Sequence, residues 1–492
     1  MTHVPTDLDV LIVGAGLSGI GAAYRLQEMR PGTAYEILEA REAIGGTWDL
    51  FRYPGIRSDS DMYTLSYPFK PWTHRKAIAD GADIRAYIEE TAHENGIHDR
   101  LRFGHKVVSA SWSSADARWT VTATGPDGEV VRTARFLYLC SGYYDYDEGY
   151  TPDFEGLDDF GGTVVHPQFW PEDLDYAGKR VVVIGSGATA VTLIPSMATG
   201  EGAAAHVTML QRSPTYITAL PGEDPLAAVT RKVLPAETAH RVTRLRHATL
   251  ALGFYQFCRK LPGPARNVLL KRATAKLPED FDRTHLEPAY DPWDQRLCIV
   301  PNGDLFKALR AGSASIVTDH IERFTPSGIS LRGGGHLEAD IVVTATGLKV
   351  VSFGKIAIDV DGEALDPHTR FTYKGLMFSG VPNLAWCIGY TNASWTLRAD
   401  LTHKYVARFL LHLDRRAYAF GMPDPDGPRG EARPVLDLSS GYVQRAVQHL
   451  PQQGSERPWT VRQNWMLDAI DHARTDLDEA MVWTPVTMDR TA

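Results

Sequence analysis

Two stretches of this chain share one arrangement, in which a short apolar strand runs into a glycine turn and then into a helix. In the first, Leu8–Val13 is followed by Gly14-x-Gly16-x-x-Gly19; in the second, Val181–Ile184 is followed by Gly185-x-Gly187-x-x-Ala190. Such a turn leaves backbone N–H groups and the positive end of the helix facing outward, where a pyrophosphate can bind. The sequence therefore predicts an α/β fold with two Rossmann-like dinucleotide-binding domains.

The first site has further support downstream. The expected second strand, Tyr35–Leu38, ends in Glu39, twenty residues beyond Gly19, and an acid at this spacing can reach a ribose hydroxyl. Paired glycines then allow close approach to phosphate in the segment from Gly45 to Asp49, although an ordinary surface loop is the alternative. The residues expected to bind this first cofactor are Gly14, Gly16, Gly19, Glu39, Gly46, Thr47, Trp48 and Asp49.

The second site differs in its charge. After the expected strand Val207–Leu210 comes Arg212, at the position where the first unit carries glutamate. An acid repels a 2′-phosphate, whereas a guanidinium pairs with it, so the first site suits FAD or NAD and the second suits NADPH. The alternative is that Arg212 is a solvated surface charge. The second site is expected to comprise Gly185, Gly187, Ala188, Thr189, Arg212 and Ser213.

A chain of 492 residues is too long to fold around a single hydrophobic core, so we expect several domains. Period-two segments predict a small antiparallel insertion over 107–139, and residues 226–276 predict basic helices in an inserted subdomain. The buried strand Asp340–Thr344 ends in a small-residue turn with Thr346 and Gly347, where the chain returns to the first domain. The expected boundaries are 1–145 and 346–492 for the FAD domain, 146–221 and 291–345 for the NADPH domain, and 222–290 for the helical insertion.

Composition narrows the class of protein. The net charge of −9 argues against nucleic acid as a partner. The four cysteines have no metal-ligand spacing, which favours reduced, buried thiols and no metal site. Without a signal peptide or an apolar run of roughly 20 residues, a cytoplasmic protein is expected. The basic helices could touch anionic lipid or form a solvated face, and both interpretations stay open.

A third helix start follows Gly389. The segment from Tyr390 to Ser394 contains Asn392, and such a helix N-terminus can face a ligand with partial negative charge, such as a reduced flavin ring. Plain helix capping is the alternative.

The connector between the two nucleotide motifs reads Phe160-x-Gly162-x-x-x-His166-x-x-x-Trp170-Pro171. With the two glycine motifs, it resembles the fingerprint of the class B flavoprotein monooxygenases, and specifically of the type I Baeyer–Villiger enzymes. The similarity extends to GGTWD, RYPGIRSD and the Ala345–Gly347 turn. It is closest to the subgroup that contains the mycobacterial thioamide-activating monooxygenases.

This resemblance implies FAD in the first site, NADPH in the second, and O₂ as co-substrate. It implies conversion of ketones to esters or lactones through a flavin peroxide, with sulfide oxidation alongside. By the same resemblance, Arg296 is the catalytic arginine beside the flavin, Asp59 pairs with it and also contacts cofactor, and Arg212 selects the 2′-phosphate. His166 is expected to couple the domains. Many relatives carry lysine before the catalytic arginine, whereas this chain has Gln295, which weakens the expected preference for NADPH.

Other interpretations remain. An S- or N-oxygenating flavin monooxygenase is the main alternative, although relatives of that kind usually have Phe or Tyr in place of Trp170. A non-catalytic redox sensor that holds both nucleotides is a more distant one. Asp59 could instead cap a helix, and Arg296 could be a structural salt-bridged arginine.

Overall fold

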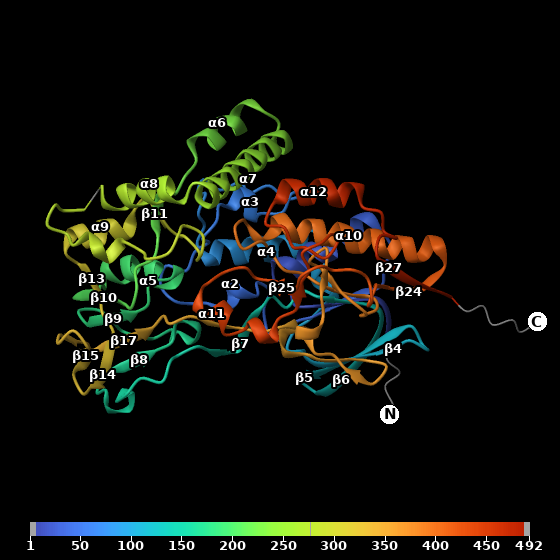
Figure 1. Cartoon of the computed structure of the whole chain (residues 1–492), viewed down its shortest axis with the longest axis horizontal. Coiled ribbons are helices and arrows are strands. Elements are labelled where there is room, and N and C mark those ends of the chain that lie inside the picture. Colours follow the sequence, from blue (N-terminus) through green and yellow to red (C-terminus); the bar gives the residue numbers. More distant parts are fainter. Residues whose placement is uncertain (1–5, 276, 487–492) are drawn as a thin grey trace, which may run out of the picture.

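A computed structural model describes residues 6–275 and 277–486, so Lys276, within the expected basic stretch, lies outside the described residues. A mixed nine-stranded sheet and a parallel five-stranded sheet lie at opposite ends of the long axis, on the right and on the left of Figure 1 respectively. This arrangement confirms the predicted pair of dinucleotide-binding folds.

The nine-stranded sheet is built around β1 (Thr6–Val13), which lies parallel to β2 (Tyr35–Leu38) on one side and β6 (Gly128–Leu139) on the other. Its strand order is β20-β19-β4-β5-β6-β1-β2-β3, and β23 also pairs with β6. The other strands are β3 (Leu101–Arg102), β4 (Lys106–Ser113), β5 (Arg118–Gly125), β19 (Ala357–Val360), β20 (Glu363–Ala364) and β23 (Leu384–Trp386).

The predicted antiparallel insertion is present as β4, β5 and β6, but it is not a separate unit. The first half of β6 completes the antiparallel ribbon with β5, and its buried second half runs parallel to β1. One long strand therefore joins the insertion to the central sheet. Along its length the side chains change from exposed and half-buried in the ribbon to fully buried beside β1.

The five-stranded sheet has the order β13-β10-β9-β17-β8, and all its pairings are parallel. Its strands are β8 (Thr163–Val165), β9 (Arg180–Ile184), β10 (His206–Gln211), β13 (Ala314–Thr318) and β17 (Ile341–Thr344). Since the carboxyl ends of parallel strands share one edge, the loops after β9 and β10 meet there.

Two chain segments connect the sheets, and they run side by side. β7 (Tyr144–Gly149) leaves the first domain and pairs antiparallel with β18 (Leu348–Val350), which returns to it. The link that leaves the first domain is therefore itself a strand. Figure 1 shows β7 between the two sheets.

The helices follow the glycine turns or cover the sheets. α1 (Leu17–Met29) and α5 (Ala188–Ala198) begin at the two glycine motifs, and α10 (Trp395–Arg416) packs along α1. The predicted helical insertion is confirmed as α6 (Pro225–Val233), α7 (Ala236–Lys260) and α8 (Pro262–Thr274). Further helices are α3 (Met62–Leu65), α4 (Gly81–Glu94), α9 (Asp304–Ala311), α11 (Gly441–Gln444) and α12 (Trp465–Arg474).

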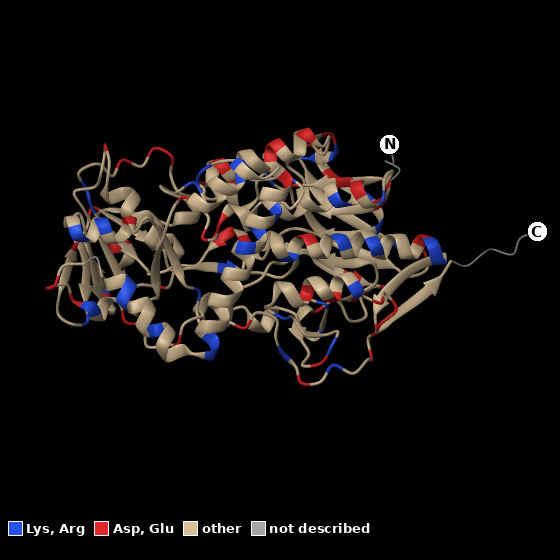
Figure 2. Ribbon diagram, turned by 90° about the horizontal axis from the view of Figure 1, so that it is seen from above, with Lys and Arg blue, Asp and Glu red and all other residues tan. Residues whose placement is uncertain are grey.

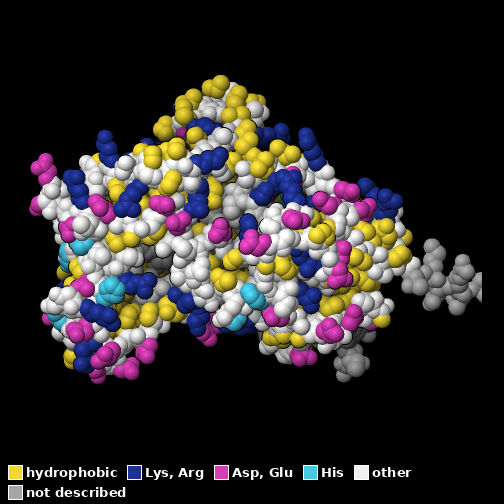
Figure 3. All heavy atoms as spheres, viewed as in Figure 1, with side chains coloured by type: hydrophobic (Ala, Val, Ile, Leu, Met, Phe, Trp, Pro, Cys, Tyr) yellow, Lys and Arg dark blue, Asp and Glu magenta, His cyan; other side chains and the backbone are white. Residues whose placement is uncertain are grey.

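The insertion projects from the body at the top of Figure 1, and its tip is covered by hydrophobic side chains in Figure 3. Figure 2 shows acidic and basic residues interspersed over most of the ribbon, so the basic excess of residues 225–275 is a local feature. Within residues 6–275 and 277–486, no helix combines the length and apolarity needed to cross a bilayer. The four cysteines are free and buried, as expected.

Candidate active site at the junction of the two sheets

The first glycine turn is shaped for close backbone approach. Gly14 adopts φ +101°, and a Cβ on it would lie 2.7 Å from the carbonyl oxygen of Cys140. Gly16 is the N-cap of α1, and no side chain of the described residues caps the first N–H groups of this helix. Gly46, with φ +56°, brings its own backbone against Gly16. These free N–H groups between glycine backbones fit a pyrophosphate, and Gly19 packs the helix against the turn.

The acidic residues near this turn are already engaged by the protein. Glu39 is buried and accepts hydrogen bonds from the backbone N–H of Ala15 (2.7 Å) and of Arg41 (2.9 Å). Burial raises the pKa of Glu39, and the two N–H donors oppose that rise. Its carboxylate therefore braces the glycine turn, and the predicted contact to a ribose would use its remaining lone pairs.

Asp49 is the centre of an ionic cluster. Its buried carboxylate contacts the guanidinium groups of Arg41 (2.7 Å), Arg52 (2.6 Å) and Arg85 (3.1 Å). The cluster fixes the short helix α2 (Thr47–Leu50) beside the first turn. A direct cofactor contact by Thr47, Trp48 or Asp49 stays a prediction.

The second glycine turn is open to solvent. Gly185 has φ +131° and lies against the backbone of Ala345, whereas a Cβ on Gly187 would meet nothing within 4 Å. Gly187 is the N-cap of α5, again without a capping side chain from the described residues. Ala188 is exposed, and Thr189 is half-buried. This turn also fits a pyrophosphate.

Arg212 and Ser213 follow β10 at the same edge of the sheet and are exposed. The Ser186 hydroxyl donates to the carbonyl of Ser213 (3.2 Å), which ties the glycine turn to the loop carrying Arg212. The Arg212 guanidinium has no carboxylate partner within the described part of the chain. It is free to pair with an anionic ligand at this edge.

Arg296 lies where segments of both domains meet. Its Nη1 donates to Asp59 Oδ2 (3.4 Å) and its Nη2 donates to the Tyr143 hydroxyl (3.2 Å). Its Nε is buried and lacks a partner among the described residues. The hydroxyl of Tyr143 is the main cause that holds the pKa of Arg296 well above its usual range, and Tyr442, Tyr144 and Asp59 add to it. The Arg296 side chain is therefore always charged.

The segment around Asp59 spans the junction. Tyr53 is buried in the core of the five-stranded domain, and Arg57 forms an ion pair with Asp304 at the start of α9. Asp59 does not cap the following helix, because Asp61 is the N-cap of α3 and accepts from Thr64 N (2.9 Å). The structure thus leaves the Asp59 carboxylate beside Arg296 rather than at a helix end.

The connector residues lie against the two linking strands. His166 Nδ1 accepts from the backbone N–H of Gln168 (3.2 Å), and the ring packs on Gly149 at the end of β7. Its Nε2 is buried and unpartnered among the described residues, and burial lowers the pKa of the imidazole. A neutral ring wedged against the linker fits a coupling role better than proton transfer.

The other fingerprint residues support the five-stranded domain. Phe160 is buried and covers Gly162, and Trp170 packs on the core that contains β9 and β10. Thr346 donates to the carbonyl of Tyr150 (2.6 Å), and the neighbouring Gly347 adopts φ +115° in the return turn.

Asn392 points away from the helix end. Its side-chain amide donates to the carbonyl of Gln463 (2.8 Å), and the Ser394 hydroxyl hydrogen-bonds Thr64 Oγ1 (2.5 Å). The capping interpretation is therefore wrong for both side chains, since α10 starts without a side-chain cap among the described residues. The free N–H groups of its first turn remain available to a ligand.

Three aromatic residues at the site have no counterpart in the sequence-based prediction. Tyr143 stacks on Trp395 (ring centroids 5.5 Å apart), and Tyr442 lies beside Arg296, where burial raises the pKa of its hydroxyl to about 12. Tyr143 follows the carboxyl end of β6, a position that could have been flagged as a ligand edge. Nothing in the C-terminal sequence signals Tyr442.

Comparisons with known proteins agree with this geometry. Residues 12–76 match the model of the NAD(P)-binding Rossmann-like domain family. Among solved structures, the fold matches an oxidized steroid monooxygenase bound to NADP (TM-score 0.77, 24% identity, 98% of this chain and 100% of that one). It also matches cyclohexanone monooxygenase from Rhodococcus bound to NADP⁺ (TM-score 0.74, 18% identity, 98% and 100%).

Two relatives are far more similar in sequence. The chain is 53% identical over 461 residues to the FAD-containing monooxygenase EthA of Mycolicibacterium smegmatis, which covers 94% of this chain and 93% of that relative. It is 52% identical over 473 residues to EthA of Mycobacterium tuberculosis, with 96% of each chain covered. The chain belongs to the family of FAD-containing monooxygenases.

Proposed function

We propose that this protein is an NADPH-dependent Baeyer–Villiger monooxygenase that inserts an oxygen atom from O₂ into ketones, giving esters or lactones. When bound, NADPH supplies a hydride, and FAD passes the electrons to O₂, so that one oxygen atom enters the substrate and the other leaves as water. The first glycine turn would hold FAD and the second would hold NADPH.

The observation that carries the proposal is the Arg296 guanidinium, held by Asp59 and Tyr143 at the junction of the two domains. A fixed cation next to the reacting oxygen atoms stabilises the negative charge that develops on them and on the ketone oxygen. The unpartnered Nε gives Arg296 a donor that the protein does not use. Asp59 would orient Arg296, while Tyr143 and Tyr442 would restrict water around it.

The linking strands suit a change in domain position during turnover. Among the described strands, β7 and β18 form the pair that links the two sheets, and His166 packs against Gly149 of β7. A small rotation there would move the NADPH domain relative to the flavin while leaving both sheets intact. We propose that residues 1–145 and 346–492 form the FAD domain, that 146–221 and 291–345 form the NADPH domain, and that 222–290 form the helical insertion.

Product analysis with ketone and sulfide panels tests this function. NADPH oxidation that is stimulated by ketone and yields ester supports the proposal. Sulfoxide as the sole product would support the S-oxygenating alternative, and FAD binding without any turnover would support the sensor.

We also propose that α6 makes a weak contact with anionic membrane surfaces. Leu226, Val229 and Val233 are 62%, 57% and 73% exposed, and Arg231 and Lys232 lie on the same short helix. Exposed apolar and basic side chains together favour the interface of anionic lipid. Sedimentation with anionic vesicles should exceed that with neutral vesicles, and Val229→Gln with Val233→Gln should abolish the difference; equal sedimentation would refute the contact.

A further inference from the structure

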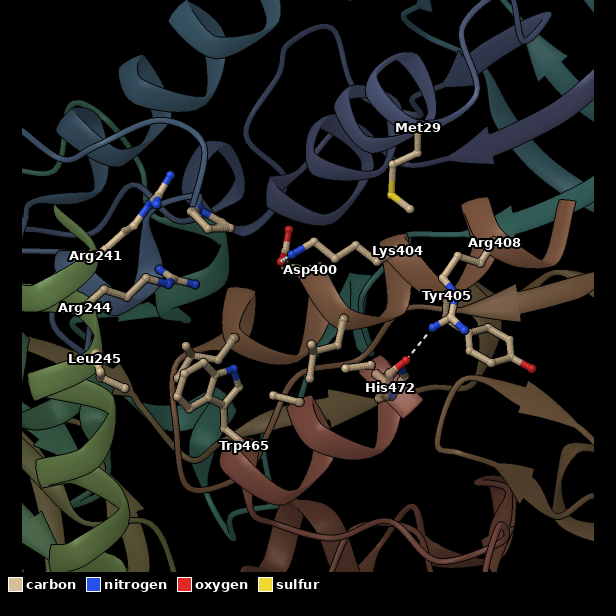
Figure 4. A pocket seen from close by; sticks show the side chains of 15 residues that line it. Met29, Arg241, Arg244, Leu245, Asp400, Lys404, Tyr405, Arg408, Trp465 and His472 are labelled. Carbon is tan, nitrogen blue, oxygen red and sulfur yellow. Dashed lines mark hydrogen bonds and ion pairs between the residues drawn. The ribbon is translucent and has the colours of Figure 1, made fainter. Parts of the chain in front are cut away.

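A cavity of about 490 Å³ lies away from both nucleotide turns, between α7, α10, α12 and the end of α1. Figure 4 shows α7 on its left, α10 behind it and α12 below it. None of the residues proposed to hold FAD or NADPH lines it. Its volume is in the range of small-molecule binding sites.

The interior of the cavity is predominantly apolar. Its apolar lining includes Leu245 of α7, Leu397 and Leu401 of α10, and Trp465 and Ala469 of α12. The lining runs along α10 from Leu397 to Arg408, a rise of eleven residue steps, which corresponds to about 16 Å of helix. Along this stretch Leu397 and Leu401 alternate with Asp400, Lys404 and Arg408, so the lining suits an elongated ligand that has both a hydrocarbon chain and a charged end.

The cavity also carries an excess of positive charge. Its lining contains Arg241, Arg244, Lys404 and Arg408 but one acid, Asp400. That carboxylate is shared between Arg25 (2.7 Å) and Lys404 (2.8 Å). Asp400 also opposes the burial that lowers the pKa of Arg244, and Arg241 pairs with Glu237 (3.5 Å), which is not in the lining. The lining itself therefore keeps an excess of positive charge that is only partly compensated.

Two of the guanidinium groups are satisfied by backbone oxygens alone. Arg244 is 8% exposed and donates to the carbonyls of Tyr63 (3.1 Å), Thr64 (2.9 Å) and Ser66 (2.7 Å). Arg408 donates to the carbonyls of His472 and Thr475. Neither forms an ion pair with a carboxylate in the described part of the chain. Cations without anionic partners beside an apolar surface favour an anion there.

The exposed cations lie at the rim of the cavity. The Arg241 side chain is 79% exposed and the Lys404 side chain is 42% exposed, and Figure 4 shows each entering from a different helix. His472, also in the lining, has a buried Nδ1 without a partner among the described residues. Its free ring nitrogen offers one more polar contact next to Arg408.

We propose that this cavity is a second binding site, which takes a single-chain fatty carboxylate. The hydrocarbon chain lies against Leu397, Leu401 and Trp465, and the carboxylate pairs with the cations at the rim. The site needs no bound nucleotide and no turnover, so it stands apart from the proposed oxygenation chemistry.

Calorimetric titration of the FAD-loaded enzyme with sodium dodecanoate, below its micelle concentration, tests the proposal. We expect saturable binding with one site, with affinity rising by up to about fourfold per methylene from octanoate to dodecanoate. Dodecanol, which has the same chain without the charge, should bind at least tenfold more weakly. Equal affinity for dodecanol and dodecanoate would overturn the anion site.

Variants distinguish the contact to the hydrocarbon chain of the ligand from the contact to its carboxylate. Ala469→Phe, or Ala473→Leu as a second filling variant, should lower dodecanoate affinity at least tenfold without loss of FAD. Arg241→Gln with Lys404→Gln should reduce dodecanoate affinity to that of dodecanol. The matched control, Arg415→Gln with Arg416→Gln at the exposed end of α10, should leave binding unchanged. Unaltered binding in both filling variants would show that the fatty acid binds elsewhere and would refute the site.

Discussion

Replacing Arg212 by glutamine tests the proposed discrimination between NADPH and NADH. Arg212 is exposed and makes no ion pair with a described carboxylate, so its removal costs the fold little. Gln295, at the position where many relatives carry lysine, is neutral and cannot replace the lost charge. The change therefore isolates one guanidinium–phosphate contact.

The expected size of the loss in NADPH binding follows from the exposure of the Arg212 side chain. A hydrogen bond to a charged group contributes about 1.5–3 kcal/mol, and the open position of Arg212 favours the lower end. A loss of about 1.5 kcal/mol corresponds to roughly a tenfold rise in KM for NADPH. The KM for NADH should stay the same, because NADH has no 2′-phosphate.

Steady-state NADPH and NADH oxidation at two salt concentrations measures this effect. The difference between wild type and Arg212→Gln should shrink at high ionic strength, since the contact is solvent-exposed. Lys179→Gln, an exposed cation just before β9 and thus at the opposite edge of the same sheet, is the matched control. An equal loss for both cofactors, or no loss for NADPH, would refute the assignment.

Two further predictions concern coupling and pH. Gly149→Ala should lower the thermal unfolding midpoint and slow turnover, because its Cβ would collide with the His166 ring; the second change His166→Ala should restore the midpoint, and failure to do so would rule out this contact. Burial lowers the pKa values of His403 and His472 to about 3, whereas unfolded histidine titrates near 6.5. The unfolded state thus binds more protons, and stability should fall as pH drops from about 6.5 towards 3, by about 1.4 kcal/mol per pH unit for each ring. In unfolding measurements between pH 7 and 4.5, His403→Gln should show a shallower decline than wild type, and an identical decline would contradict this origin.

Much of this fold is readable from local sequence because its signals are local. A buried strand, a glycine turn and a helix predict β1 with α1 and β9 with α5 within a few residues of their observed bounds. The position of Arg212 after β10 follows from the same repeat.

Features that depend on tertiary packing could not be predicted from the local sequence. The continuation of β6 into the central sheet depends on its pairing with β1, more than a hundred residues earlier in the chain. Asn392 turns to Gln463 because the C-terminal segment folds back over the start of α10. Tyr143 and Tyr442 reach Arg296 from two distant segments, and no spacing rule connects them.

Ester formation by Arg296→Ala is the most direct test of the role proposed for this guanidinium. We expect the variant to retain FAD and to oxidise NADPH to NADP⁺ with reduction of O₂ to hydrogen peroxide, while ester formation falls at least a hundredfold, as for the loss of about 3–4 kcal/mol of oxyanion stabilisation. Arg259→Ala, which removes a neighbouring guanidinium paired with Asp294 (2.6 Å), should keep wild-type product ratios. Ester formation at the wild-type rate in FAD-loaded Arg296→Ala would contradict the proposed role of this guanidinium.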